Sequence, residues 1–254
     1  MKLNASIKYQ LADSKKSILV FYTVILSVIT LTFFSALKAI DSITVTANVG
    51  GIEGATIIFL FIVGLNSFKD NFRMLLQNGV SRKTMFKGFI LTSLIIAIGM
   101  SLIGNIILQL GKLMVLVNDK IIFLGMFEEL YGQRYIGNSS GFQINLEGTL
   151  FWICVYSTVL MIGYLITVLY YRMNKGGKIA VSVGVPVFLM IGLPIIDLTL
   201  INVEIYGTML KIFLFAFGFF NGANPYYGMV TCILIYLLFS VLSWLLIRKA
   251  VVRS

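Results

Sequence analysis

The chain has 254 residues, of which 59% are hydrophobic and 12% are charged, and its mean hydropathy is +0.97. A water-soluble core cannot absorb so much apolar surface, so the composition excludes a soluble domain and predicts an all-α polytopic membrane protein. The net charge of +10 would suggest nucleic-acid binding in a soluble protein, but the position of the charges explains it in this chain, and no nucleic-acid partner is expected.

Residues 1–16 are expected to form an amphipathic helix in the headgroup layer, because Leu3, Ile7 and Leu11 recur four apart with lysines between them. A disordered basic tail is the alternative. The apolar run that follows is too long for the core of a signal peptide and has no convincing cleavage site after it. It is therefore expected to remain as the first span, residues 17–40.

Residues 69–81 follow the second span, 54–68, and are predicted to form a short helix outside the membrane. Gly79 can end this helix in the left-handed conformation, and Ser81 can cap the next one. Lipid does not require an apolar face outside the membrane, so the apolar stripe of this helix predicts docking to a partner protein, mainly through Phe72 and Leu76. The stripe has helical spacing and comprises Phe68, Phe72, Leu75 and Leu76.

The third span, residues 84–118, is longer than the roughly 30 Å hydrocarbon core requires, so it must protrude, tilt or break. Small and polar residues recur along it at four-residue spacing. This face can pack closely against another helix, since small residues allow backbones to approach and amides in lipid need partners. Alternatively, its outer half lines a pathway or a subunit interface through Ser101, Asn105 and Gln109.

The second half of the chain is expected to contain an outer loop, three further spans and one shorter apolar segment. Pro186 and Pro194 remove backbone donors from the fifth span and are expected to kink it. The shorter segment has only 12 residues, which suits a re-entrant or interfacial outer helix better than a span. The ranges are 119–147 for the loop, 148–171, 179–198 and 226–247 for the spans, and 209–220 for the short helix.

The distribution of charge predicts the topology. With six spans and both termini cytoplasmic, the inner segments hold 15 of the 20 basic residues but only two of the 10 acidic residues, Asp13 and Asp70. Inner loops of membrane proteins carry such an excess of Lys and Arg. A multi-pass protein of the cell membrane with both termini in the cytoplasm is therefore expected.

Residue types exclude several kinds of catalysis. The chain has no histidine, which excludes Ser-His and Cys-His pairs and histidine metal sites, and it has no Walker A sequence for ATP. Glu128, Glu129 and Arg134 are similar to the EExxxR motif of intramembrane prenyl-protein proteases, but their spacing is one residue too long. A solvated acidic loop explains them better. The chain is not expected to be an enzyme or to hold a metal or cofactor.

The predicted architecture resembles that of the permease subunits of type 2 ABC exporters. The resemblance lies in four features taken together: an amphipathic N-terminal helix, six spans, an inner hairpin between spans two and three, and a short outer helix before the last span. Residues 75–88, LLQNGVSRKTMFKG, are similar to the G-x-S-R turn of small bacterial permeases of this kind. These include lantibiotic-immunity, bacitracin and phenol-soluble-modulin exporters. The architectural resemblance covers the whole chain, whereas the motif is short.

The resemblance implies a transmembrane subunit that exports an amphipathic peptide, a drug or a lipid-like molecule from a bacterial cell. It implies a second permease copy or a sister permease, and separate ABC ATPase subunits that carry ATP and Mg²⁺. The inner hairpin would be the coupling helix that docks on the ATPase. The residues implied are Phe72, Arg73, Leu75, Leu76, Gln77, Asn78, Gly79 and Arg82, with Arg172, Asn174 and Lys175 as a second contact. A secondary transporter and a non-transporting sensor or assembly subunit are the alternatives.

Overall fold

The computed structural model of the protein describes residues 2–38, 47–48, 51–115, 121–136, 141–199 and 205–250. Nearly all of these residues are helical, and the two strands described, β1 (Ala47–Asn48) and β2 (Ile121–Ile122), pair in parallel. Five of the described helices are long and apolar enough to cross a membrane, or six if α2 (Ile52–Asn66) and α3 (Lys69–Gln77), bent by 40°, form one span. The predicted all-α polytopic membrane protein is therefore confirmed at this level.

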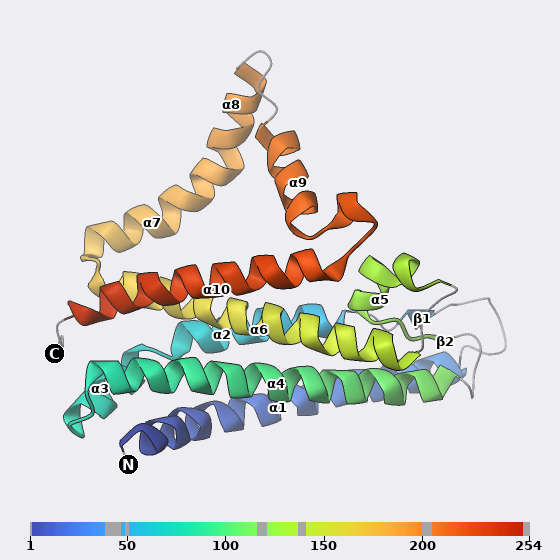
Figure 1. Ribbon diagram of the computed structural model, residues 1–254, viewed down its shortest axis with the longest axis horizontal. Helices are drawn as coiled ribbons and strands as arrows, with labels where there is room; N and C mark the ends of the chain where they lie inside the picture. The colour runs from blue at the N-terminus through green and yellow to red at the C-terminus, as the bar shows by residue number, and fades with distance from the viewer. Residues whose placement is uncertain are drawn as a thin grey trace.

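Long helices that lie side by side form the body of the molecule (Figure 1). Helix α6 is central, because it packs against α2, α4 and α10, while α1 packs against α4. The body consists of α1 (Lys2–Lys38), α2, α4 (Arg82–Val115), α6 (Gly141–Arg172) and α10 (Pro225–Arg248).

Helices α2 and α6 cross in direct backbone contact at two glycines. A Cβ atom at Gly64 would lie 2.5 Å from the carbonyl oxygen of Leu160, and one at Gly163 would lie 2.6 Å from that of Phe61. Helices in lipid associate largely through van der Waals packing, and glycine allows the closest approach. The crossing therefore fixes α2, and with it the start of α3, to the central helix.

The fold separates the chain into two ends. Figure 1 places the start of α1, helix α3, the turn from α6 to α7 and the end of α10 at one end of the body, which we name the basic end. The opposite end, named the cap end, holds the two strands and α5 (Met126–Tyr131). The segments whose Lys and Arg residues predicted a common side of the membrane thus lie together at the basic end.

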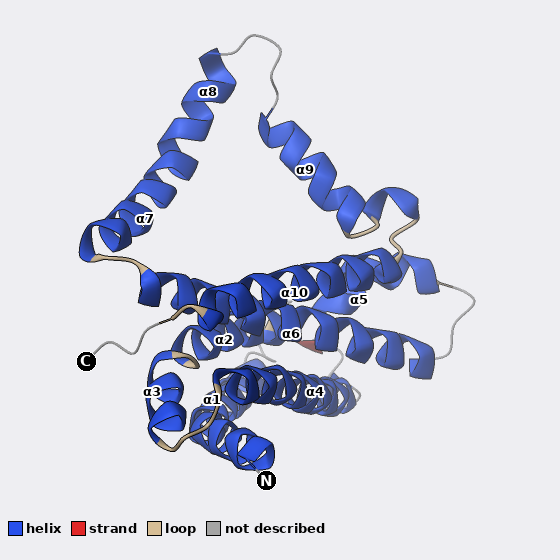
Figure 2. Ribbon diagram, turned by 60° about the vertical axis from the view of Figure 1, so that its left-hand side comes forward, coloured by secondary structure: helices blue, strands red, loops and turns tan. Residues whose placement is uncertain are grey.

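A helical arm projects from this body (Figures 1 and 2). Two hydrogen bonds hold its outgoing and returning halves together: Asp197 Oδ1 accepts one from the Ile205 amide at 2.6 Å, and the Tyr206 hydroxyl donates one to the Leu189 carbonyl at 3.2 Å. None of the described residues of α7, the π-helix or α9 is buried. The arm comprises α7 (Lys175–Val187), the π-helix (Phe188–Gly192), α8 (Leu193–Thr199) and α9 (Ile205–Ala216).

The two prolines expected to kink the fifth span flank the π-helix. Pro186 lies near the end of α7, and Pro194 follows Leu193, whose amide donates to the Phe188 carbonyl five residues back. Because Pro194 has no amide hydrogen, the helix cannot make its usual bond at that position. The irregularity takes the form of a π-turn within a helix that continues.

The N-terminal segment differs from the separate interfacial helix expected for residues 1–16. Helix α1 continues without a break into the first apolar run, since neither proline nor glycine separates the two parts. Its first turns pack on α4, where Gln10 donates to the Met85 carbonyl at 3.3 Å and Ser6 occupies the space above Gly88. This face of the segment is therefore covered by protein.

The predicted ranges 54–68, 84–118, 148–171, 179–198 and 226–247 fall on α2, α4, α6, α7 to α8, and α10. Helix α6 begins earlier than residue 148, at Gly141, because part of the expected loop is helical. The short apolar helix is α9, which ends at Ala216 instead of residue 220, since Gly218 adopts a left-handed φ of 76°. Positions 39–40 and 116–118 of the predicted spans lie outside the described residues.

Candidate functional site

The apolar face of α3 is turned into the molecule. Phe68 stacks on Phe72 with ring centroids 4.9 Å apart and contacts Tyr164 and Tyr171 of α6 edge-on at 5.5 and 5.3 Å. Phe72 is fully buried, and Leu75 is nearly so. The prediction that this stripe is offered to a partner is therefore corrected, because the chain's own α6 covers it.

The turn after α3 follows the predicted chemistry. Gly79 has a φ of 68°, and the Val80 amide donates to the Leu75 carbonyl at 2.9 Å, the pattern of a glycine-terminated helix. Ser81 Oγ accepts a hydrogen bond from the Thr84 amide at 3.2 Å and so caps α4. Three connected features, a buried stripe, a closed turn and a capped helix, hold α3 in one orientation.

The opposite face of α3 is exposed at the basic end. Its central residue is Met74, whose side chain is 44% exposed although it is apolar. Lys69, Asp70 and Gln77 surround it, so the face combines both signs of charge with an apolar centre. Protein interfaces typically have a polar rim around an apolar centre, and Met is enriched in that centre. This is the exposed face of α3, of which the sequence analysis named Gln77 but not Met74.

Other residues predicted to contact a partner have structural roles in the chain. Leu76 is half-buried against the same aromatic cluster, and Arg82 donates to the Arg248 carbonyl at the end of α10 at 2.9 Å. Gly79 also accepts a hydrogen bond from Lys2 Nζ at 2.9 Å. Arg73 is half-buried, whereas Asn78 is exposed. These contacts tie α3 and the α3–α4 turn to both ends of the chain.

The second predicted contact lies at the same end of the body as α3 (Figure 1). Arg172 ends α6, and Asn174 caps α7, where its Oδ1 accepts a hydrogen bond from the Gly177 amide at 2.9 Å. Lys175 is exposed. The structure therefore places the two predicted patches on one end of the molecule, although Asn174 is used by the fold itself.

The polar face of α4 packs against α6. Ser101 donates to the Thr149 carbonyl at 2.9 Å, and Asn105 Nδ2 donates to Thr149 Oγ1 at 2.7 Å. Gln109 is exposed and donates to Asn105 Oδ1 at 3.2 Å. Ser101 and Asn105 thus make the interhelical hydrogen bonds that the packing interpretation expects, whereas Gln109 bonds within α4.

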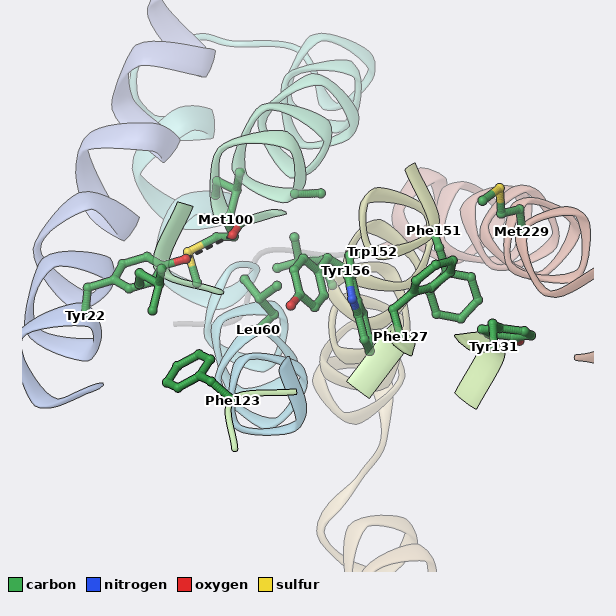
Figure 3. Close-up of a cluster of buried hydrophobic side chains, with 14 of the residues drawn as sticks. Tyr22, Leu60, Met100, Phe123, Phe127, Tyr131, Phe151, Trp152, Tyr156 and Met229 are labelled. Carbon is green, nitrogen blue, oxygen red and sulfur yellow. Dashed lines mark hydrogen bonds between the residues drawn. The ribbon is translucent and has the colours of Figure 1, made fainter. Parts of the chain in front are cut away.

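The same face also borders a cavity at the cap end, between α2, α4, α5 and α6. The cavity has a volume of about 30 Å³, measured as the space that the centre of a water-sized group can occupy. It therefore has room for one or two such groups. Figure 3 shows Phe127 of α5 beside Trp152 and Tyr156 of α6, and these rings form its aromatic wall. The polar lining includes Glu53, Ser101, Asn105, Glu128, Asn145 and Thr149.

Two carboxylates at this cavity differ in their surroundings. Glu128 forms an ion pair with Lys112. Glu53 is only 8% exposed, and its Oε1 accepts a hydrogen bond from the Met126 amide at 3.2 Å. Among the described residues, Glu53 has no ion-pair partner. The cavity wall thus carries a buried carboxyl group that has no ion-pair partner in the described part of the chain.

Within the segment expected to be an outer loop, residues 119–147, the described residues 121–136 form a cap with several aromatic side chains. Tyr131 of α5 donates to the Phe217 carbonyl at 3.0 Å and stacks on Phe219, which links the cap to the returning end of the arm. Tyr135 is buried and donates to Glu147 Oε2, and burial together with this bond raises the pKa of the Tyr135 phenol. The cap closes the end of the body over the cavity.

Ser101 and Asn105 were named from the sequence as possible lining residues, whereas Glu53 and the aromatic residues of the cavity were not, and only a weak signal marked these. Trp152 and Tyr156 lie four residues apart on one helix face, which is equally typical of a packed core. Glu53 precedes an apolar run, where an exposed position is the usual expectation. The pairing of α5 with α2 is a long-range contact, and no local pattern indicates it.

Comparison with protein families, with curated proteins and with solved structures finds no significant match to this chain. Within the described residues, no group of three or more His, Cys, Asp or Glu side chains lies close enough to hold a metal ion.

Proposed function

We propose that the chain is the transmembrane subunit of an ATP-driven exporter and that a separate ATPase subunit docks on α3. The observation that carries this proposal is the two-sided nature of α3. One face is anchored on α6 by four aromatic rings, and the other is exposed with Met74 at its centre. A helix that passes force from a partner into the bundle needs both properties.

The ring contacts between α3 and α6 would transmit the proposed motion from the ATPase to the body helices. When the ATPase pair closes on ATP, it pushes on the exposed face of α3, and the ring contacts of Phe68 pass that displacement to Tyr164 and Tyr171. Packed cores shift as units because interdigitated side chains do not deform continuously. The body helices would then tilt together, which is the movement that alternating access requires.

In this proposal both termini are cytoplasmic and the basic end meets the ATPase in a bacterial cell membrane. ATP and Mg²⁺ belong to that partner. A second permease copy or a sister permease completes the pathway, and the cargo is an amphipathic peptide, ahead of a drug or a lipid. The choice of cargo rests on the family resemblance alone.

The test is co-expression of the chain with the ATPase that its gene neighbourhood supplies. We expect a detergent-stable complex in which the chain raises the rate of ATP hydrolysis. Met74→Asp places a charge at the centre of the exposed face and should reduce this stimulation by about tenfold, since central interface residues carry about 1–2 kcal/mol or more each.

Tyr9→Asp is the matched control, because Tyr9 is 36% exposed at the basic end but lies on α1. Stimulation that Tyr9→Asp and Met74→Asp reduce equally would place the ATPase elsewhere. A chain that neither binds the ATPase nor stimulates it would be explained instead by a secondary transporter or by a sensor or assembly subunit.

A further inference from the structure

We infer that the cap-end cavity binds one protonated amine, such as a lysine ammonium group or the amino terminus of a peptide. The inference rests on the proposed function for the molecule that carries the amine, the peptide cargo. Its physical basis is independent of the ATPase, because charge, ring faces and size of the cavity all favour the same small cation.

The charge of the lining favours a cation. Glu128 pairs with Lys112, which leaves Glu53 as the carboxyl group of the lining without an ion-pair partner among the described residues. Burying an ionised carboxylate without a counter-charge is so costly that the group takes up a proton instead. A bound ammonium group supplies the counter-charge that the ionised form of Glu53 requires.

The aromatic wall selects the kind of cation. Phe127, Trp152 and Tyr156 line the same cavity as Glu53. Ammonium groups are attracted to aromatic faces, and tryptophan is the strongest of these. Hard metal ions instead require several oxygen ligands in a closed shell. Only two of the described lining residues are carboxylates, and one of them, Glu128, already pairs with Lys112.

The size and access of the cavity fit an ammonium at the end of a chain. The volume of about 30 Å³ holds one or two water-sized groups but not a whole peptide. The lining residues on the side where α4 faces α6, among them Gly104, Asn105 and Asn145, are half-buried. This side of the cavity is therefore not fully closed, and an ammonium group can enter it while the rest of its alkyl chain stays outside.

A second cavity in the molecule shows what the same fold does without charge. Near the basic end, Gln10 and Thr92 line a space of about 10 Å³ together with serine and asparagine side chains. The buried atoms Gln10 Oε1 and Thr92 Oγ1 have no protein partner there. No carboxylate of the described residues borders this space, so a neutral hydrogen-bonding molecule such as water suits it and a cation does not.

The chain supplies its own reporter for amine binding. It has two tryptophans, and Trp244 stacks on Phe86 at 5.7 Å in the basic-end cluster, away from the cavity. The Trp244→Phe variant, purified in detergent, leaves Trp152 in the cavity wall as the only tryptophan. Titration with n-butylammonium chloride should give a saturable change in its fluorescence, whereas 1-butanol, of similar shape but neutral, should not.

Two carboxylate variants in the same background decide the assignment. Glu53→Gln keeps an oxygen for the Met126 amide but removes the charge, and should weaken butylammonium binding at least about tenfold. Glu129→Gln is the matched control, since Glu129 is exposed on α5 and does not line the cavity, and should change binding less than about twofold. Gel filtration and thermal unfolding verify that both variants are folded.

The inference is overturned if butylammonium gives no saturable response, if Glu53→Gln leaves the response unchanged, or if 1-butanol gives the same response. Sodium chloride forms a further arm at equal ionic strength, and an identical saturable response to it would show an inorganic cation site instead. All of these measurements omit the ATPase. Loss of amine binding with intact ATPase stimulation would therefore refute this inference alone, and the reverse result would refute the proposed function.

Discussion

The two ends of α6 carry aromatic clusters of different kinds. At the basic end, Phe89 stacks on Tyr164 with centroids 3.7 Å apart, and Phe68 and Phe72 close the cluster from α3. The members of this cluster are apolar or aromatic throughout. At the cap end, Trp152 and Tyr156 stack at 5.4 Å but share their surroundings with a cavity and a buried carboxylate.

This difference indicates different tasks. Interlocked rings do not deform continuously, so the elements that meet in the basic-end cluster move as one unit. A cavity beside a buried charge lowers stability and is retained where a ligand compensates for it. The basic end is thus suited to transmit force, and the cap end is suited to bind a small group.

The largest effect on stability is expected at the crossing of α2 and α6, which lies between the two ends of α6. Gly163→Ala would place a Cβ atom 2.6 Å from the Phe61 carbonyl oxygen and 2.9 Å from the Leu65 amide, so α2 and α6 must separate. We expect a loss of about 3–4 kcal/mol in the free energy of unfolding, at the upper range of overpacking effects. Unfolding in mixed detergent, followed by far-UV circular dichroism, measures it.

Gly99→Ala is the matched control, because a Cβ atom at Gly99 on α4 would meet nothing within 4 Å. Alanine has the higher helix propensity, so this variant should be unchanged or more stable by up to about 1 kcal/mol. If Gly163→Ala were tolerated as well as Gly99→Ala, the two clusters would not depend on one crossing.

The next effect concerns the basic-end cluster alone. Phe72→Ala removes a fully buried ring that contacts Phe68 and Tyr171, and should cost about 3 kcal/mol of stability. Met74→Ala, two residues along the same helix, removes an exposed side chain and should change stability by less than about 0.5 kcal/mol. Thermal unfolding monitored by aggregation in detergent compares them. Equal losses would mean that α3 is not seated as described.

The contrast between Phe72 and Met74 also shows what sequence reasoning could predict. The spacing of Phe68, Phe72 and Leu75 predicted the helix and its apolar face, and Gly79 predicted its end, because these are local properties of the chain. Which surface covers that face depends on α6, about 90 residues further along, and no local pattern contains that information. The sequence analysis therefore expected a partner protein to cover the apolar face of α3, whereas α6 covers it.

The cap end was less predictable for the same reason. The polar face of α4 indicated a helix contact, and Asn105 and Ser101 do bond to Thr149 of α6. The position of Glu53 beside that contact depends on α5, which lies in a segment of mixed composition that predicted a loop. Periodicity identifies faces of helices, whereas a cavity arises where several faces meet imperfectly.

The smallest effects on stability are expected at Glu147 and Glu53, the two buried carboxylates compared at the cap end. Glu147 accepts hydrogen bonds from Tyr135 and Gln143, so Glu147→Gln loses an acceptor and should cost about 1–2 kcal/mol. Glu53 accepts from its own backbone amide and from that of Met126 but, among the described residues, has no ion pair, so Glu53→Gln removes the cost of a buried ionisable group and should raise stability by about 1 kcal/mol. Unfolding of both variants at pH 7 without amine gives the sign of each change in the free energy of unfolding.

If Glu53→Gln destabilised the protein as much as Glu147→Gln does, Glu53 would be an ordinary structural carboxylate. Opposite signs would mean that the empty cap end keeps a charge at the expense of its own stability, as a binding site for a cation requires.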